Sequence, residues 1–418
     1  MWTIAIEIHT INTQEDTPYK QGKILPDPGV QALLAAKKSG DKVLVIAHDL
    51  DYYPERIRSI ADHWEQADTN DPADIARAAL RVAPSTSIRQ MFSFVDSFVA
   101  PTAIAANLLK IPSVNALSMG ICRNKSSIRD CLAAKGADYV QHETINIDNI
   151  KSLKSPIGYP AVAKPVDGAA SWDVEIVNTD SELQNLAYRH HQRSYGRGAR
   201  QRKQFVIEEV LTGPVWSCEG VVSFNGKPII YGWTDREISG SPGFTEISLG
   251  FSPHEPVENA NEWVTRILKE LKYDLGGFHI ECALTPTGIH LIEINPRLAG
   301  GGTDQAITAV YGINIVEYTL AAMRSHPSPL PAPRGAATKR NIYRNQTGKI
   351  SHIEGLDSVL TIDGFIGLQL DIREGDVLDV HGSPVGTKIG YAIARGKNRK
   401  QANRRSYLVD KNLNIKFN

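Results

Sequence analysis

Two apolar segments, FHIECAL at 278–284 and HLIEINPRLAGG at 290–301, restrict the fold of this chain more than any other feature. Apolar and polar residues alternate in both, which predicts two strands of a sheet that is covered on one face. In the second strand Glu293, Asn295 and Arg297 stand at alternate positions, so their side chains project from the same face. With Glu281 in the first strand, the pattern predicts two carboxylates, an amide and a guanidinium on one surface.

These polar groups indicate a site for a divalent metal ion. Two carboxylates and an amide oxygen suit a hard cation such as Mg²⁺, which keeps some of its water and takes other ligands from substrate phosphates. The alternative is a solvated strand face with an incidental charge pair. The glycine-rich turn that follows opens a helix, so the amides of Gly301 and Gly302 would stabilise an anion or a developing oxyanion there; a flexible turn is the alternative.

Two lysines and a short loop precede these strands and suit a phosphate group. Lys125 stands at the start of a predicted helix, and Lys164 ends the predicted strand YPAVAKP. An ammonium group is a suitable point charge for a phosphate, although a single lysine is usually a surface residue. The loop 168–171 could lay backbone amides over terminal phosphates. After the apolar strand FVIEEVL, Glu208 and Glu209 could hold an adenine amine and a ribose, or could simply cap the strand.

The N-terminal region has the pattern of a parallel α/β sheet. Apolar runs at 2–8 and 43–47 enclose the predicted helix GVQALLAAKKSG, and a second helix is expected after Asp71 and Pro72. MFSFVDSFV alternates like a further strand. Because no GxGxxG or GxxxxGK[ST] motif follows the early strands, this region is not expected to bind a nucleotide.

We expect five consecutive regions. They are a parallel domain at 1–113, a linker with the helix SSIRDCLAAKGA at 114–155, a compact region at 156–212, an antiparallel core at 213–330 and a small β-rich domain at 331–418.

Composition excludes several classes of function. Lysine plus arginine and aspartate plus glutamate balance at 46 each, so no overall field attracts nucleic acid or an anionic membrane. The basic stretches lack interleaved aromatic residues and are interpreted as solvated loops. The four cysteines show no CxxC spacing, which fits a reducing compartment. Without a signal-like start or a long apolar run, a cytoplasmic protein is expected.

The ordered set NKxxxR, AKP with a small-residue loop, IEEVLxG, HxE and IEINPRLAGG resembles the ATP-grasp superfamily over about residues 90–395. Within it, FVDSFV, KPVDGAAS, GFTEISLGFSP and NPRLAGG are most similar to L-amino-acid ligases, the dipeptide synthetases. The resemblance implies a multidomain fold of the α/β and α+β classes. Its parts would be an N-terminal Rossmann-like parallel sheet, a mobile lid at 156–212 and a C-terminal antiparallel core.

The resemblance also implies roles for individual residues. ATP and two magnesium ions, replaceable by Mn²⁺, would be the cofactors, and Glu281, Glu293 and Asn295 the metal ligands. Arg297 would neutralise an acyl-phosphate intermediate, assisted by the amides of Gly301 and Gly302. The nucleotide would contact the following residues: Lys125, Lys164, Gly168, Ser171, Glu208, Glu209, Val210, Leu211 and Ile292. The chain departs from the family pattern at Trp172-Asp173, in the phosphate loop, and at Val215, where a carboxylate is common.

The expected function is ATP-dependent joining of two L-amino acids into a dipeptide, with release of ADP and phosphate. Trp216, Glu219, Glu246 and the loop 240–256 are predicted to line the amino-acid pocket. Two alternatives remain at this point: a carboxylase-type enzyme that activates bicarbonate or formate, and an ATP-binding regulator without catalysis. No nucleic-acid or membrane partner is expected, and a homodimer is an expectation from the family alone.

Overall fold

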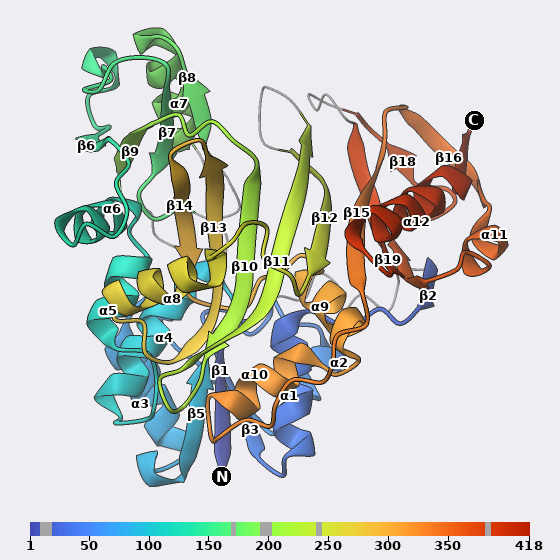
Figure 1. The fold of residues 1–418 in the computed structure, drawn as a ribbon. Helices are drawn as coiled ribbons and strands as arrows, with labels where there is room; N and C mark the ends of the chain where they lie inside the picture. Colours follow the sequence, from blue (N-terminus) through green and yellow to red (C-terminus); the bar gives the residue numbers. More distant parts are fainter. Residues whose placement is uncertain (9–18, 169–172, 193–202, 240–244, 381–385) are drawn as a thin grey trace.

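The computed structural model describes residues 1–8, 19–168, 173–192, 203–239, 245–380 and 386–418. Its N-terminal part is a parallel sheet with strand order β4-β3-β1-β5 (Figure 1). The strands are β1 (Trp2–Ile6), β3 (Lys42–Ala47), β4 (His63–Gln66) and β5 (Ile88–Phe92). The helices beside them are α1 (Pro28–Lys38), α2 (Glu55–Arg58), α3 (Pro72–Val82) and α4 (Asp96–Leu108). The prediction of a parallel sheet here is confirmed.

One local prediction in this region is wrong. The stretch MFSFVDSFV is not a single strand, because β5 ends at Phe92 and α4 begins at Asp96. Its alternating apolar residues serve two elements, since Met91 and Phe92 are buried in the strand and Phe98 and Val99 in the helix. The change of element places Asp96 in the first turn of α4, at the end of the parallel sheet.

A nine-stranded sheet forms the centre of the molecule, with order β14-β13-β10-β11-β12-β15-β19-β17-β2. Its strands are β10 (Val215–Val222), β11 (Pro228–Ser239), β12 (Thr245–Ser252), β13 (Gly276–Thr285), β14 (Gly288–Asn295), β15 (Ala336–Arg344), β17 (Phe365–Leu370), β19 (Thr387–Gly396) and β2 (Tyr19–Gly22). The predicted loop 240–256 therefore contains a strand at Thr245–Ser252; residues 240–244 lie outside the described part.

Helices cover the two faces of this sheet in different places. On one face, called here the α8 face, Cys218, Trp233 and Ile280 pack against α8 (Ala260–Glu270). On the other, the α9 face, Val221, Tyr231 and Phe251 pack in one core with residues of the following helices: α1, α9 (Thr303–Tyr311) and α10 (Ile315–Ala322). The polar residues predicted on β13 and β14 belong to the α9 face, beyond the part that these helices bury.

A second, four-stranded sheet lies beside α6, with order β6-β9-β7-β8 (Figure 1). Its strands are β6 (His142–Asn146), β7 (Ala161–Pro165), β8 (Glu175–Val177) and β9 (Gln204–Glu209), and α7 (Asp180–Gln192) shares its core. Two helices, α5 (Ala116–Cys122) and α6 (Lys125–Ala134), precede it. Asn124 caps α6 by accepting a hydrogen bond from the Ser127 amide.

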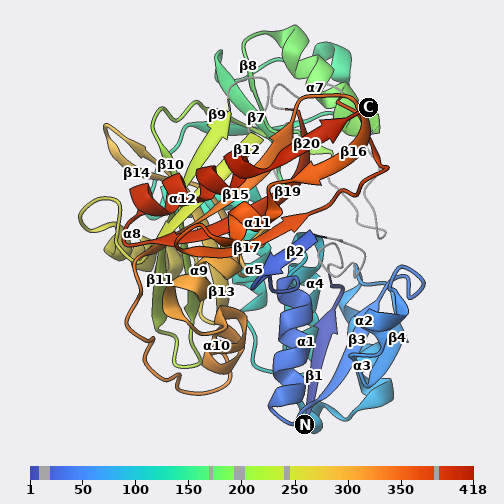
Figure 2. The same ribbon diagram turned by 90° about the vertical axis from the view of Figure 1, so that its right-hand side faces the viewer.

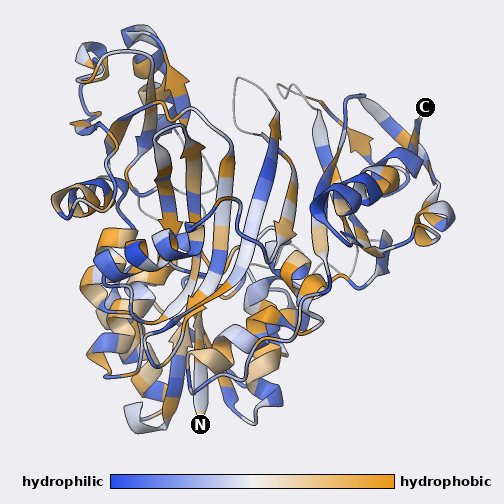
Figure 3. Ribbon diagram, in the orientation of Figure 1, coloured by the Kyte–Doolittle hydropathy of each residue, from blue (hydrophilic) through white to orange (hydrophobic). Residues whose placement is uncertain are grey.

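The C-terminal region does not separate cleanly from the core at residue 331. Strands β15, β17 and β19 continue the nine-stranded sheet. A separate small sheet consists of β16 (Gly348–Glu354), β18 (Val377–Leu378) and β20 (Asn414–Phe417), of which β16 and β20 are labelled in Figure 2. The last two helices are α11 (Leu356–Leu360) and α12 (Arg399–Asn412), of which α12 is predominantly hydrophilic (Figure 3). Among the described residues, no helix has both the length and the apolar character that crossing a bilayer requires. All four cysteines are free thiols.

Candidate functional site

The register of three neighbouring strands brings the predicted metal ligands together. In the β13–β14 pair Glu281 stands directly opposite Glu293, and His279 stands opposite Asn295. On the other side of β13, Ser217 and Glu219 of β10 face the same two residues. Because side chains alternate along a strand, all of these residues project from the α9 face.

Each of the two facing carboxylates has a cationic partner. The Lys125 ammonium lies 2.9 Å from Glu293, and the Asn295 amide donates a hydrogen bond of 2.6 Å to the same carboxylate. Arg236 lies 2.9 Å from Glu281. Burial by itself would raise the pKa of both carboxyl groups, but Lys125 and Arg236 outweigh it and hold both pKa values below their usual range. Both groups are therefore ionised at neutral pH.

The donor set fits a magnesium ion bound together with a phosphate. Within the described residues, no three His, Cys, Asp or Glu side chains form a metal-binding cluster by themselves. Two facing carboxylates and one amide leave several coordination positions to water and phosphate oxygens, which is the usual arrangement for Mg²⁺. The ion pairs with Lys125 and Arg236 hold the two carboxylates charged on the same surface.

A buried histidine supports this surface from behind. His279 lies between Glu219 and Glu281, with one ring nitrogen 2.9 Å from each carboxylate. Burial alone would lower the pKa of His279, but the two carboxylates raise it to about 9. Glu219 was predicted to contact substrate. It lies on the α9 face but is completely buried beside His279, where it also accepts a hydrogen bond of 2.8 Å from Ser217.

The raised pKa of His279 predicts a pH-dependent stability. A pKa near 6.5 in the unfolded chain and near 9 in the folded protein means that the contribution of His279 is complete below pH 6.5 and is lost as the pH rises through 9. The contribution of Lys339 to stability changes with pH in the opposite direction, because burial lowers its pKa to about 8. A single melting curve therefore mixes the two effects. The difference in melting temperature between the metal-free wild type and His279→Gln isolates the histidine. We expect this difference to shrink between pH 6.5 and 9; a constant difference would contradict the assignment.

Lys164 and Arg129 join the four-stranded sheet to β14 through Glu208. The Glu208 carboxylate, 3% exposed, lies 2.7 Å from Lys164 and accepts two hydrogen bonds of 3.0 Å from the Arg129 guanidinium. Arg129 also donates to the carbonyl groups of Leu291 and Ile292. Burial would raise the pKa of Glu208, but these cations lower it to about 2. The charges of Lys164 and Arg129 are thus held directly beside β14, the strand that carries Glu293.

The other predicted nucleotide contacts lie around these charges. Lys125 donates a hydrogen bond of 2.7 Å to the Gly168 carbonyl, at the start of the predicted phosphate loop; Ser171 and Trp172 lie outside the described residues. Glu209 pairs with Gln141, accepting a hydrogen bond of 2.7 Å from its amide, and Val210 and Leu211 follow directly after β9.

Asp173, which departs from the family pattern, is buried within hydrogen-bonding distance of His190, at 2.8 Å. Its carboxylate therefore has a partner inside the four-stranded sheet and α7.

Arg297 is held by a carboxylate from the N-terminal region. Asp96 accepts two hydrogen bonds from its guanidinium, at 2.7 and 2.5 Å, and Arg123 lies 3.8 Å from the same carboxylate. Burial would raise the pKa of Asp96, but the two arginines lower it to about 2. The pair of hydrogen bonds between Arg297 and Asp96 fixes the orientation of the Arg297 guanidinium beside the metal ligands.

The glycine turn after β14 meets a second pair of charged residues. Gly301 and Gly302 adopt positive φ angles of 66° and 91°, and Gly302 caps the N-terminus of α9. A Cβ atom on Gly302 would lie 3.2 Å from the Lys339 side chain. Lys339 in turn lies 3.2 Å from Glu246, which also lies 3.4 Å from Arg236. Glu246, predicted to contact substrate, is therefore paired with two cationic side chains at this surface.

Trp216 is not part of this surface. It is separated by an odd number of positions from Ser217 and Glu219, so it projects from the α8 face, where the Arg399 guanidinium lies 4.2 Å from its ring centroid. The prediction that Trp216 and Glu219 share a pocket is therefore wrong.

Sequence reasoning missed Asp96, Arg236, His279 and Lys339. His279 is two positions from Glu281 on the same strand, so strand alternation could have placed it on the same face. No local sequence pattern marks Asp96, Arg236 or Lys339 as site residues.

Comparisons with known proteins agree with this geometry. A family profile described as an ATP-grasp domain matches residues 157–305. An uncharacterised protein, y4rH, of Sinorhizobium fredii is 26% identical over 332 residues, which are 77% of this chain and 67% of that protein. A formate-dependent phosphoribosylglycinamide formyltransferase of Synechococcus is 22% identical over 90% of this chain and 91% of its own. The crystal structure of an L-amino acid ligase from Bacillus licheniformis has a TM-score of 0.77 at 18% identity, covering 100% of this chain and 98% of that one.

Proposed function

Since this chain has the ATP-grasp fold and residues 157–305 are an ATP-grasp domain, we propose that it is an ADP-forming ligase that joins two L-amino acids through an acyl phosphate. The observation that carries the proposal is the pair of facing carboxylates, Glu281 and Glu293, with Lys125 2.9 Å from one of them. The resemblance to the L-amino acid ligase extends over both whole chains, which supports amino acids as the substrates.

We assign the nucleotide to the space between the four-stranded sheet and β14. Lys125 and Lys164 would contact its phosphates, with Glu208, Glu209 and the backbone to Leu211 holding adenine and ribose. Glu281, Glu293 and Asn295 would hold magnesium, which offsets the negative charge of the triphosphate. Binding of the nucleotide would replace the contact of Lys125 with Glu293 by a contact with phosphate.

The reaction has two steps. A carboxylate oxygen of the first amino acid attacks the γ-phosphorus of ATP, the bond to the bridging oxygen breaks, and ADP leaves. The amine of the second amino acid then attacks the acyl carbon, phosphate leaves with the electrons of the broken bond, and the nitrogen releases a proton. Arg297 and the amides of Gly301 and Gly302 would stabilise the negative charge on the tetrahedral oxygen. Positioning and charge neutralisation suffice, and no nucleophilic side chain is needed.

Asp96 serves as a positioning residue in this scheme, because it touches Arg297 and not the substrate. Asp96→Asn keeps the size of the side chain but loses the charge that orients the guanidinium. We expect kcat to fall about tenfold, while the KM for ATP stays unchanged. A purely structural role would instead lower the melting temperature and leave kcat per folded molecule intact.

A second function is favoured by one observation. The Synechococcus formyltransferase matches this chain over 91% of its own length, and its name gives formate as its substrate. A carboxylase-type or formate-activating enzyme would use the same metal and phosphate residues on a smaller carboxylate.

One experiment separates the two functions. ADP release is measured with ATP, Mg²⁺ and all pairs of L-amino acids, and in parallel with bicarbonate and formate, followed by mass detection of the products. We expect ADP release that depends on an amino-acid pair, with a product of dipeptide mass. Release that depends on formate or bicarbonate and ignores amino acids would contradict the proposal.

A further inference from the structure

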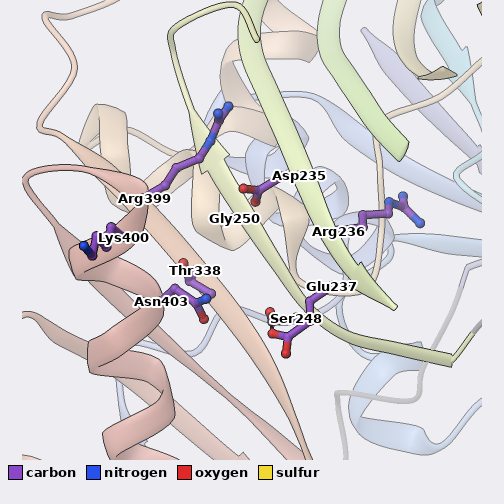
Figure 4. Close-up of a pocket in the computed structure, with 9 residues that line it drawn as sticks. All are labelled: Asp235, Arg236, Glu237, Ser248, Gly250, Thr338, Arg399, Lys400 and Asn403. Carbon is purple, nitrogen blue, oxygen red and sulfur yellow. Dashed lines mark hydrogen bonds between the residues drawn. The ribbon is translucent and has the colours of Figure 1, made fainter. Parts of the chain in front are cut away.

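A cavity opens on the α8 face of the nine-stranded sheet, where β11, β12 and β15 meet the first turn of α12 (Figure 4). Its volume is about 220 Å³. We call it the α12 pocket; its lining residues are Asp235, Arg236, Glu237, Ser248, Gly250, Thr338, Arg399, Lys400 and Asn403. Arg236 contributes only its backbone to the pocket wall. Its side chain points away from the other lining residues (Figure 4) and contacts Glu281. The pocket is thus on the opposite side of the sheet from the proposed metal site.

The acidic side of the pocket carries Asp235, whose nearest charge partner, Arg399, makes no direct contact with it. Asp235 is half-buried, yet it forms no ion pair within 4.0 Å with any residue that the structure describes. Gly250 stands opposite it on β12, and a Cβ atom there would lie 2.3 Å from Asp235 Oδ1. Glycine is therefore required at 250 for the carboxylate to keep this position. Burial is the largest effect on the pKa of Asp235 and raises it, while the charge of Arg399 lowers it by less.

The basic side is built from the start of α12. Trp216 lies under the Arg399 guanidinium, which also donates a hydrogen bond of 3.1 Å to the Trp233 carbonyl. These two contacts hold Arg399 in place while its Nε has no hydrogen-bond partner in the described structure. Lys400, the next residue, is exposed at the mouth. The pocket is therefore lined by an arginine, a lysine and the carboxylate of Asp235.

Thr338 places a second polar group without a protein partner on the pocket. Its side chain is 1% exposed, it lines the pocket, and its hydroxyl has no hydrogen-bond partner among the described residues. A buried hydroxyl without a partner costs free energy, and such groups in folded proteins usually meet a ligand or water. In Figure 4 Thr338 lies between Asp235 and Asn403, on the wall of the cavity.

We propose that the α12 pocket binds a free α-amino acid, with its ammonium group on Asp235 and its carboxylate on Arg399 and Lys400, beside the Thr338 hydroxyl. Opposite charges on the two sides of a small cavity match a small zwitterion and disfavour ligands that carry one charge only. The inference does not depend on the reaction at the opposite face. Arg236 follows Asp235 on β11 and contacts Glu281, so neighbouring residues of one strand face the pocket and the metal surface.

Isothermal titration calorimetry of the full chain tests the proposal, with each proteinogenic L-amino acid as the probe and without nucleotide or magnesium. We expect at least one amino acid to bind, and its decarboxylated amine and its deaminated acid to bind at least about tenfold more weakly. Asp235→Asn should abolish binding. Thr338→Val, which preserves the shape of the side chain, should weaken binding about tenfold without lowering the melting temperature.

Glu262→Gln is the matched control, because Glu262 is an exposed glutamate that does not line the pocket, and its replacement should leave this binding unchanged. Failure of the ligase proposal would remove amino-acid-dependent ADP release and still leave this binding in place. The proposal is overturned if no amino acid binds. It is also overturned if binding survives in Asp235→Asn, if Thr338→Val binds as tightly as the wild type, or if the amine alone binds as tightly as the amino acid.

Discussion

Replacing Glu293 by glutamine is expected to reduce amino-acid-dependent ADP release on the order of 10²–10³-fold. The substitution preserves the shape of the side chain but removes one of the two facing carboxylates that would hold magnesium. Steady-state ADP release at saturating ATP and amino acids measures the effect. The melting temperature should change little, because Glu281 and Glu293 repel one another, and the loss of one charge offsets the loss of the ion pair with Lys125.

Glu262→Gln is the control for this variant. Glu262 is an exposed glutamate in the first turn of α8, on the opposite face of the sheet, and its replacement should leave ADP release at the wild-type rate. Full activity in Glu293→Gln, or an equal loss in both variants, would refute the metal assignment.

Arg297→Lys is the second large effect that we expect. Lysine keeps the positive charge but cannot form the two-pronged contact with Asp96, so the cation is no longer fixed beside the glycine turn. We expect kcat to fall on the order of 10²-fold, because the interaction is made chiefly with the charge that develops in the transition state. The KM for ATP should stay within a few fold of the wild-type value. Initial rates at varied ATP and amino-acid concentrations separate these parameters.

Arg344→Lys provides the comparison. Arg344 is also an arginine paired with an aspartate and lies 2.8 Å from Asp410. This pair joins β15 to α12 in the C-terminal region. Its replacement should lower stability slightly and leave kcat unaltered. If Arg297→Lys behaves in the same way, then Arg297 is a structural residue and not part of the proposed catalytic group.

The sequence predicted the metal surface because strand alternation is a strong local signal. Glu293 and Asn295 are two positions apart, and a short connection between the strands sets them against Glu281 and His279. The same rule, applied to β10, would have separated Trp216 from Glu219, whose positions differ by three. Position 96 shows a limit of pattern reasoning, since apolar residues on both sides of Asp96 suit a strand and a helix equally.

Ion pairs between distant segments could not be read from the sequence. Lys125 reaches Glu293, and Arg129 reaches Glu208, only because α6 lies against both β14 and the four-stranded sheet. No periodicity encodes which charges meet across such an interface. The strand Thr245–Ser252 was missed for a different reason: glycine and proline before and after it resemble a loop, and its pairing with β11 and β15 is a property of the whole sheet.

The most direct test of the account is a crystal structure of the protein with ADP and Mn²⁺, in which anomalous scattering locates the metal. We expect manganese between Glu281 and Glu293, in contact with Asn295 and a phosphate oxygen, and the adenine beside the backbone of 209–211. Manganese elsewhere, or the nucleotide at the parallel sheet of the first 113 residues, would contradict the account.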